Sequence, residues 1–312
     1  MICEQVSHHP PISAFHAEAA GHYTFSGDIY PKLRFWGPSV EIQPKGILSL
    51  SLHRHGETYT WSNVNCSVHN LVMGKMYIEQ QGLMEIVCHG GHGLKAQLNF
   101  KPSSSWFSSK DVSNLVQGQI VDKRKKTLRS LYGLWTEFLA AVEPTVFEQH
   151  LGQWGKRHRE HRNRLQHQSS LADAAPVNPG EANGFPVLTG SSILWRARPR
   201  PPNSSKYYNF TLFAMMLNDL REEDRGRLPP TDCRLRPDLR AMEDGNWDMA
   251  ASEKERLEEK QREVRKRRAE KGLDWRPHWF NQQRHPLIAK EESWVFNSRY
   301  WDRQYDECDS IF

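Results

Sequence analysis

The sequence predicts an α+β protein in which an incomplete antiparallel β-barrel or meander is followed by a mixed, helical C-terminal region. Before residue 150, short apolar runs recur about every ten residues and alternate with glycine-bearing turns, as is typical of a barrel wall. After residue 200, apolar residues recur at helical spacing, and one long stretch is dense in charge. These patterns divide the chain into residues 1–150, 151–187 and 188–312.

The strands of the first part can be placed from alternation and turn residues. Residues 47–52 alternate apolar and polar side chains for part of their length, and Tyr59 and Trp61 follow across the turn at 55–57. Further strands are expected at 68–80, 83–88, 94–100, 116–121 and 128–138. Their turns would be Gln81-Gly82, His89-Gly90-Gly91 and the charged segment 122–126.

The middle part, residues 151–187, is predicted to be a disordered basic and polar insertion. A basic run at 156–164 precedes a stretch rich in Ser, Ala, Pro, Asn and Gly. It lacks the interleaved aromatic residues of a nucleic-acid surface, so no nucleic-acid partner is expected. A solvated loop and a segment that binds anionic membranes both remain open.

The last part is predicted to contain two helices and an irregular tail. The first helix spans 207–219, and the second spans 252–271 with Ser252 as N-cap and Glu255 completing a capping box. Between them, 232–240 should be an extended or turn segment broken by Pro237. Four tryptophans would pin the tail: Trp275, Trp279, Trp294 and Trp301.

Composition narrows the class of protein. The five cysteines lie far apart without a C-x-x-C pair, which argues against a zinc site or a disulfide framework and favours reduced cytosolic thiols. No apolar stretch reaches the roughly 18–20 residues of a membrane span. Any association with a membrane is therefore expected to be peripheral, and the chain is expected to be cytoplasmic. The net charge of +5 is a weak attraction toward anionic surfaces that does not choose between a membrane and a nucleic acid.

Two sets of side chains offer donors for an anion. His8 and His9 stand against Pro10 and Pro11, so a strand should end there at a rigid corner that fixes both imidazoles. In the charged helix, the spacing of Lys254, Glu258 and Arg262 keeps them within about 80° of one another, on one face. Taken alone, the spacing of the triplet favours a solvated helix with i,i+4 ion pairs.

The run EQVSHHPP at residues 4–11 resembles the signature of the oxysterol-binding protein family. Further segments resemble the family in order along the chain. These are TDCRLRPDLR at 231–240, EKERLEEKQR at 253–262, YNFT at 208–211 with Leu217-Asn218, and YWDR at 300–303. ISAFHAE at 12–18 and YPKL at 30–33 resemble the branch of related proteins one and two most.

The resemblance implies a carrier rather than an enzyme, without cofactor or metal. In that family a barrel tunnel holds either one sterol or the tails of one phosphoinositide. Because only one of them occupies the tunnel at a time, the resemblance implies that sterol and phosphoinositide are exchanged between membranes. The phosphoinositide headgroup site would comprise His8, His9, Lys254, Glu258 and Arg262 of this chain. No G-x-S-x-G, H-E-x-x-H or P-loop motif points to catalysis instead. The alternative is a non-transporting scaffold or lipid-sensing regulator.

Family members carry a long segment before this signature, including a lid and the first strands. Here only residues 1–3 precede it. We therefore expect a truncated form with open barrel edges, impaired lipid transfer and a tendency to self-associate.

Overall fold

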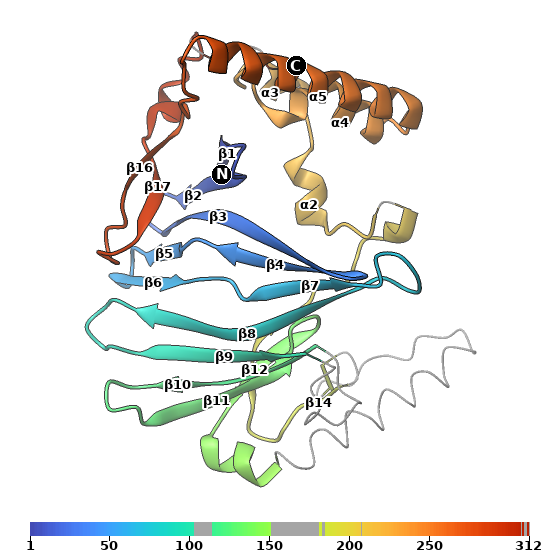
Figure 1. The fold of residues 1–312 in the computed structure, drawn as a ribbon. Helices are drawn as coiled ribbons and strands as arrows, with labels where there is room; N and C mark the ends of the chain where they lie inside the picture. The colour runs from blue at the N-terminus through green and yellow to red at the C-terminus, as the bar shows by residue number, and fades with distance from the viewer. Residues whose placement is uncertain are drawn as a thin grey trace. The chain divides into compact units, whose positions relative to one another are not determined.

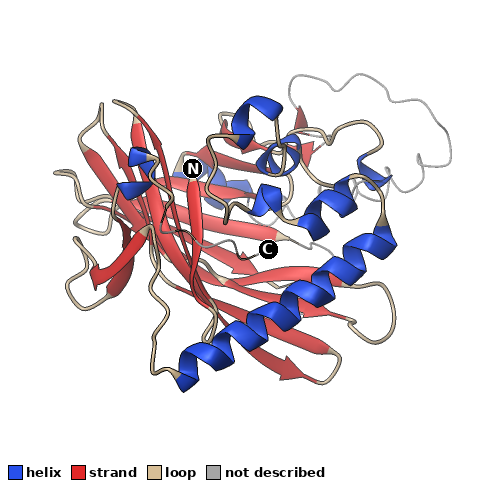
Figure 2. Ribbon diagram, turned by 90° about the horizontal axis from the view of Figure 1, so that it is seen from above, coloured by secondary structure: helices blue, strands red, loops and turns tan. Residues whose placement is uncertain are grey.

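A computed structural model of the chain describes residues 1–102, 114–150, 181–182, 185–206, 208–306, 308 and 311. The chain forms two compact units (Figures 1 and 2). The first comprises residues 1–197 and 282–295, and the second comprises 198–281 and 296–312. Most of the predicted insertion at 151–187 lies outside the described residues; β13 (Glu181–Ala182) and β14 (Phe185–Pro186) form a small separate ladder.

The first unit is built on one antiparallel sheet of thirteen strands, which confirms the predicted fold class. Along its main path the order is β1-β2-β3-β4-β7-β8-β9-β10-β11-β12-β15. β5 and β6 form a side branch between β3 and β8 (Figure 1). The strands are β1 (Ile2–Ser7), β2 (Ile12–Ala19), β3 (Tyr23–Trp36), β4 (Ser39–Lys45), β5 (Leu48–Leu52), β6 (Glu57–Trp61), β7 (Asn65–His69), β8 (Tyr77–Cys88), β9 (Lys95–Lys101), β10 (Leu115–Val121), β11 (Thr127–Leu134), β12 (Phe138–Val142) and β15 (Ser192–Arg196).

The turn predicted at Gln81-Gly82 is wrong, because β8 runs through it without a break. Before Gly82 this strand pairs with β7, and from Gly82 onward it pairs with β9. Gly82 has a φ of +120°, a conformation that other residues rarely adopt, so it permits the change of partner within one strand. The actual reversal falls at 70–76, inside the run that we expected to be strand.

The strand predicted at 128–138 is two strands. β11 ends at Leu134, a short turn follows, and β12 begins at Phe138. Phe138 then pairs with Leu134 across the turn. The apolar run hid this reversal because both strands are buried and the turn contains no Gly or Pro signal.

The core of the first unit centres on Tyr132 and Phe138, both fully buried, whose rings meet edge to face. The Tyr132 hydroxyl accepts a hydrogen bond from the Leu188 amide at 2.9 Å and lies 2.7 Å from the Ser191 hydroxyl. These bonds satisfy a buried polar group and hold the segment that leads into β15. β15 then pairs with β12, so residues predicted to belong to the helical region extend the sheet.

A late segment returns to the first unit through two long-range contacts. The amide of Trp294, in β17 (Glu292–Phe296), donates to the Asp28 carboxylate at 2.9 Å. His285, which follows β16 (Phe280–Arg284), lies 3.0 Å from the Ser49 hydroxyl. Trp294 is therefore part of a strand rather than of the irregular tail we expected.

The second unit is mainly helical. Its elements are η1 (Ser204–Lys206), α2 (Leu212–Leu217), α3 (Glu222–Arg225), η2 (Cys233–Leu235), α4 (Pro237–Glu243), α5 (Trp247–Glu270) and η3 (Arg299–Asp302). α2 is shorter than predicted because Thr211 caps it, accepting a hydrogen bond from the Ala214 amide. Pro237 does not break an extended segment but starts α4, where a missing N–H costs nothing.

The long helix α5 begins earlier than the predicted capping box. Asn246 is its N-cap and accepts from the Met249 amide, whereas the Ser252 hydroxyl donates to the Met249 carbonyl from inside the helix. Leu257 is the buried residue of α5, which packs against α4 and its buried Ala241. Trp279 is buried against the rings of Tyr300 and Tyr305.

We predict that Gly82→Ala destabilises the chain by about 1–2 kcal/mol, because alanine is strained at this positive φ. Gly91→Ala is the matched control. Gly91 lies in a loop without a positive φ, and an added Cβ would meet open space. Urea unfolding of both variants checks this, and equal stability of the two would contradict the role assigned to Gly82.

Candidate functional site

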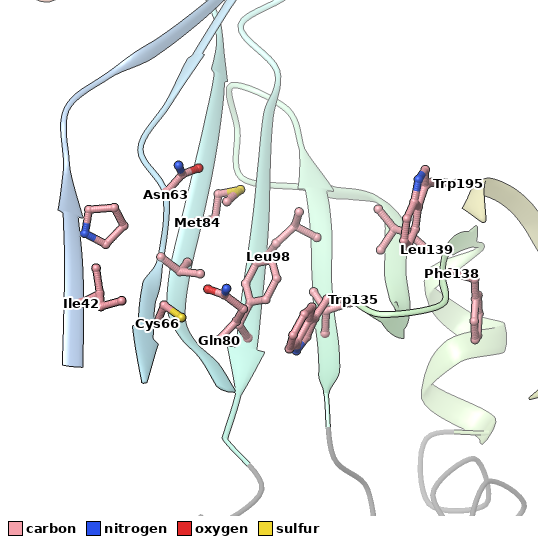
Figure 3. Close-up of a pocket in the computed structure, with 14 residues that line it drawn as sticks. Ile42, Asn63, Cys66, Gln80, Met84, Leu98, Trp135, Phe138, Leu139 and Trp195 are labelled. Atoms are coloured by element: carbon pink, nitrogen blue, oxygen red, sulfur yellow. The ribbon is translucent and has the colours of Figure 1, made fainter. Parts of the chain in front are cut away.

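The first unit contains an apolar cavity of about 560 Å³ against one face of the sheet (Figure 3). Cross-strand partners line it: Met84 of β8 pairs with Leu98 of β9, and Phe100 of β9 pairs with Val116 of β10. Because side chains alternate along a strand, such paired residues point to the same side. The volume lies within the roughly 300–1,000 Å³ typical of small-molecule sites.

A second row of residues extends the cavity towards β4. Ile42 of β4 pairs with Cys66 of β7, which pairs with Gln80 of β8. Burial raises the pKa of the Cys66 thiol, so the thiol stays neutral and behaves as a small apolar group. Gln80 and Asn63 supply amides to an otherwise mostly apolar wall. Such a lining suits an apolar molecule that carries few polar groups.

The family resemblance implied a lipid tunnel, but the sequence did not identify the residues that line this cavity. Leu98 and Phe100 lie two residues apart in a predicted strand, so their shared face could have been read from the alternation. The cross-strand register brings Met84 and Val116 to the same face, and this register could not have been predicted from the alternation.

His8 and His9 lie in the turn between β1 and β2, just beyond the last residue of β1. Their rings are 4.4 Å apart at an interplanar angle of 62°, and both residues are exposed. The strand thus ends at Ser7 rather than at the histidines, while the predicted corner with two neighbouring imidazoles is present. The arrangement presents two neighbouring imidazoles at the surface of the first unit.

Lys254, Glu258 and Arg262 all lie on α5 and are all exposed. The Lys254 Nζ is 4.0 Å from the Glu258 carboxylate, so the predicted i,i+4 relation is present as a loose ion pair. Arg236 donates a hydrogen bond to the Asp238 carboxylate. Asp238, and to a lesser extent Glu258, raises the pKa of the Arg236 guanidinium. Cations and carboxylates therefore interleave on this part of the second unit.

The two imidazoles are neighbours and the triplet lies along one helix, but the histidines belong to the first unit and the helix triplet to the second. Whether all five residues form one site stays a prediction. Within the described part of the chain, no group of three or more His, Cys, Asp or Glu residues could hold a metal ion. Among the same residues, we find no helix with both the length and the apolar character needed to span a bilayer.

Comparison with known proteins assigns the class. The Oxysterol-binding protein family matches residues 1–305, so the chain belongs to this family of lipid-binding proteins. Oxysterol-binding protein-related protein 1 of Rattus norvegicus is 48% identical over 314 residues, covering all of this chain. Related protein 2 of Homo sapiens is 45% identical over 315 residues. The chain spans 32% and 64% of these two relatives.

Solved structures agree with the family assignment. The Osh1 ORD domain in complex with ergosterol superposes with a TM-score of 0.75 at 31% identity, covering 99% of this chain and 67% of that one. The Osh1 complex with cholesterol gives the same values. The Osh3 ORD of Saccharomyces cerevisiae in complex with PI(4)P has a TM-score of 0.70 at 28% identity, with 99% and 69% coverage.

One carboxyl group beside the cavity has an unusual environment. Glu137 lies in the turn between β11 and β12, between the cavity residues Trp135 and Phe138. Its Oε2 is buried without a hydrogen-bond partner in the described residues, and desolvation raises the pKa of Glu137 from 4.5 to about 7. The folded chain thus holds this proton more tightly than the unfolded chain does.

We predict that stability falls as pH rises from about 4.5 to 7, since the unfolded state ionises Glu137 first. Glu137→Gln should remove this loss and stabilise the chain at about pH 8 by ~1–2 kcal/mol, a value discounted for partial exposure, with no gain near pH 4. Denaturant unfolding across pH measures it. Glu143→Gln, at an exposed carboxylate 2.9 Å from Arg129, is the control and should show no such gain.

Proposed function

We propose that this chain binds sterols and phosphoinositides one at a time and transfers them between membranes. The observation that carries the proposal is the apolar cavity, found in a member of a family whose solved structures hold ergosterol, cholesterol or PI(4)P. The chain spans only part of its curated relatives, so transfer by this chain is itself part of the proposal.

The cavity would hold the apolar body of the lipid. Each square ångström of apolar surface removed from water contributes about 25 cal/mol, and Met84, Leu98 and Phe100 offer the surface to bury it. The amides of Gln80 and Asn63 are candidates to hydrogen-bond a sterol hydroxyl, directly or through water. A sterol and a phosphoinositide tail pair would exclude one another from the same space, which permits exchange.

The headgroup would be held by polar groups outside the cavity. Lys254 and Arg262 would bind phosphate oxygens, Arg262 through two parallel hydrogen bonds. Glu258 would orient the two cations or accept a hydrogen bond from an inositol hydroxyl. His8 and His9 would donate from the other side. Their support is the match of both motifs to the family, the proximity of the two imidazole rings and the exposure of all five residues.

We further propose that the protein is cytoplasmic and meets membranes peripherally, as lipid exchange between bilayers requires. No step of this function breaks a covalent bond. The selectivity would come from charge-assisted hydrogen bonds at the headgroup and from apolar burial in the cavity.

Filling the cavity should weaken sterol binding. Met84→Trp places an indole in the cavity that Met84 lines, and we expect affinity for a fluorescent sterol to fall about tenfold or more. Met84→Leu, which keeps the volume and apolar character, is the control and should bind as the parent does. Unchanged sterol binding by a folded Met84→Trp chain would contradict the assignment of this cavity.

Removing headgroup contacts should separate a carrier from a scaffold. We expect Lys254→Ala/Arg262→Ala, and likewise His8→Ala/His9→Ala, to weaken binding to phosphoinositide-containing vesicles by about tenfold to a hundredfold. Lys266→Ala, at another exposed position of α5, is the matched control. If the double variants keep their fold and bind the vesicles as strongly as the control does, the proposed headgroup site is wrong. That result would favour the alternative, a non-transporting scaffold.

A further inference from the structure

Two hairpin tips at one end of the sheet form a single projection, which we call the paired tips (Figure 1). One tip is the end of the β3–β4 hairpin, residues 32–39, and the other is the β7–β8 connection with its flanks, residues 69–78. The Leu71 amide donates to the Pro38 carbonyl at 2.9 Å, and the Ser39 hydroxyl lies 3.1 Å from His69 Nδ1. The two tips therefore support one another.

The β7–β8 connection is also held from within. Asn70 adopts a positive φ, and its side-chain amide donates to the Lys75 carbonyl at 3.0 Å. His69 stacks on Tyr77, with ring centroids 4.7 Å apart. The loop conformation is thus fixed by its own contacts rather than by a covering element.

Large apolar side chains cover the paired tips and face solvent. Phe35 is 73% exposed, Trp36 65%, Val72 82% and Met73 83%. Phe35 and Trp36 are consecutive strand residues and so point to opposite faces of the hairpin. All four side chains have well over half of their surface exposed. Exposed apolar clusters of this kind mark surfaces that bind a partner.

The charges on the paired tips have one sign. Lys32, Arg34 and Lys75 are all exposed, while residues 32–39 and 69–78 contain no Asp or Glu. The nearest carboxylates along the chain lie just outside the tips. Glu41, half-buried, is the cross-strand partner of Arg34 and accepts a hydrogen bond from Asn65, and Glu79 is buried and lies 3.0 Å from His69 Nε2. An anionic partner would therefore find no repelling carboxylate on the tips themselves.

We propose that the paired tips insert into the interfacial region of an anionic lipid bilayer. A projection that is apolar on both faces suits a fluid medium that can surround it, whereas a protein partner would need a matching cleft. Trp and Phe favour the boundary between headgroups and acyl chains, and each nearby Lys or Arg adds attraction to anionic lipid. This inference deepens the proposed function by naming the surface that meets the membrane.

The test is cosedimentation of the full chain with phosphatidylcholine vesicles, with and without phosphatidylserine. Phe35→Ser/Trp36→Ser and, from the other tip, Val72→Ser/Met73→Ser should each weaken partition into the anionic vesicles about tenfold. Leu194→Ser is the matched control, because Leu194 is 55% exposed on β15, outside the paired tips, and does not line the cavity. Fluorescent-sterol binding in vesicle-free solution should stay unchanged in all three variants.

Several results would overturn the inference. The inference is wrong if the folded double variants partition into anionic vesicles as strongly as the parent does. It is also wrong if Leu194→Ser loses as much vesicle binding as the double variants lose. If the parent does not bind vesicles but self-associates, and the tip substitutions abolish that self-association, then the paired tips bind a second copy of the chain. That result would defeat the proposal. If the parent does not bind sterol but its vesicle binding depends on the tips, the proposed function is wrong and this inference stands.

Discussion

The register between neighbouring strands of the large sheet is the constraint on which the candidate site depends. Met84 meets Leu98, and Phe100 meets Val116, because β8, β9 and β10 are paired at one alignment. A shift by a single residue would turn each strand's apolar set to the opposite face. The cavity is therefore a consequence of pairing, and Gly82 contributes by letting β8 change partners without losing its alignment.

Long-range contacts fasten other strands of the sheet to later segments of the chain. Tyr132 connects β11 to the segment before β15, and the Asp28–Trp294 bond fastens a segment from the end of the chain onto β3. Each contact satisfies a polar group that would be costly to leave unpaired in the interior. The sheet is thus completed by residues far downstream of its meander.

The chemistry of the molecule is distributed over regions with different surroundings. The cavity is apolar and partly enclosed, the imidazole pair and the α5 triplet are polar and exposed, and the paired tips combine apolar side chains with cations. A lipid carrier needs all of these, because it must bury a hydrocarbon body, hold a charged headgroup and approach a bilayer.

The local patterns of the sequence sufficed for the antiparallel strands, the long charged helix and the motifs that indicate the family. They failed where a local signal had two meanings: Gly82 marks a bend rather than a turn, Pro237 starts a helix, and Asn246 rather than Ser252 caps α5. Only tertiary structure decided which apolar residues face the cavity and that β15 joins β12, because register and long-range pairing depend on partners that no local window contains.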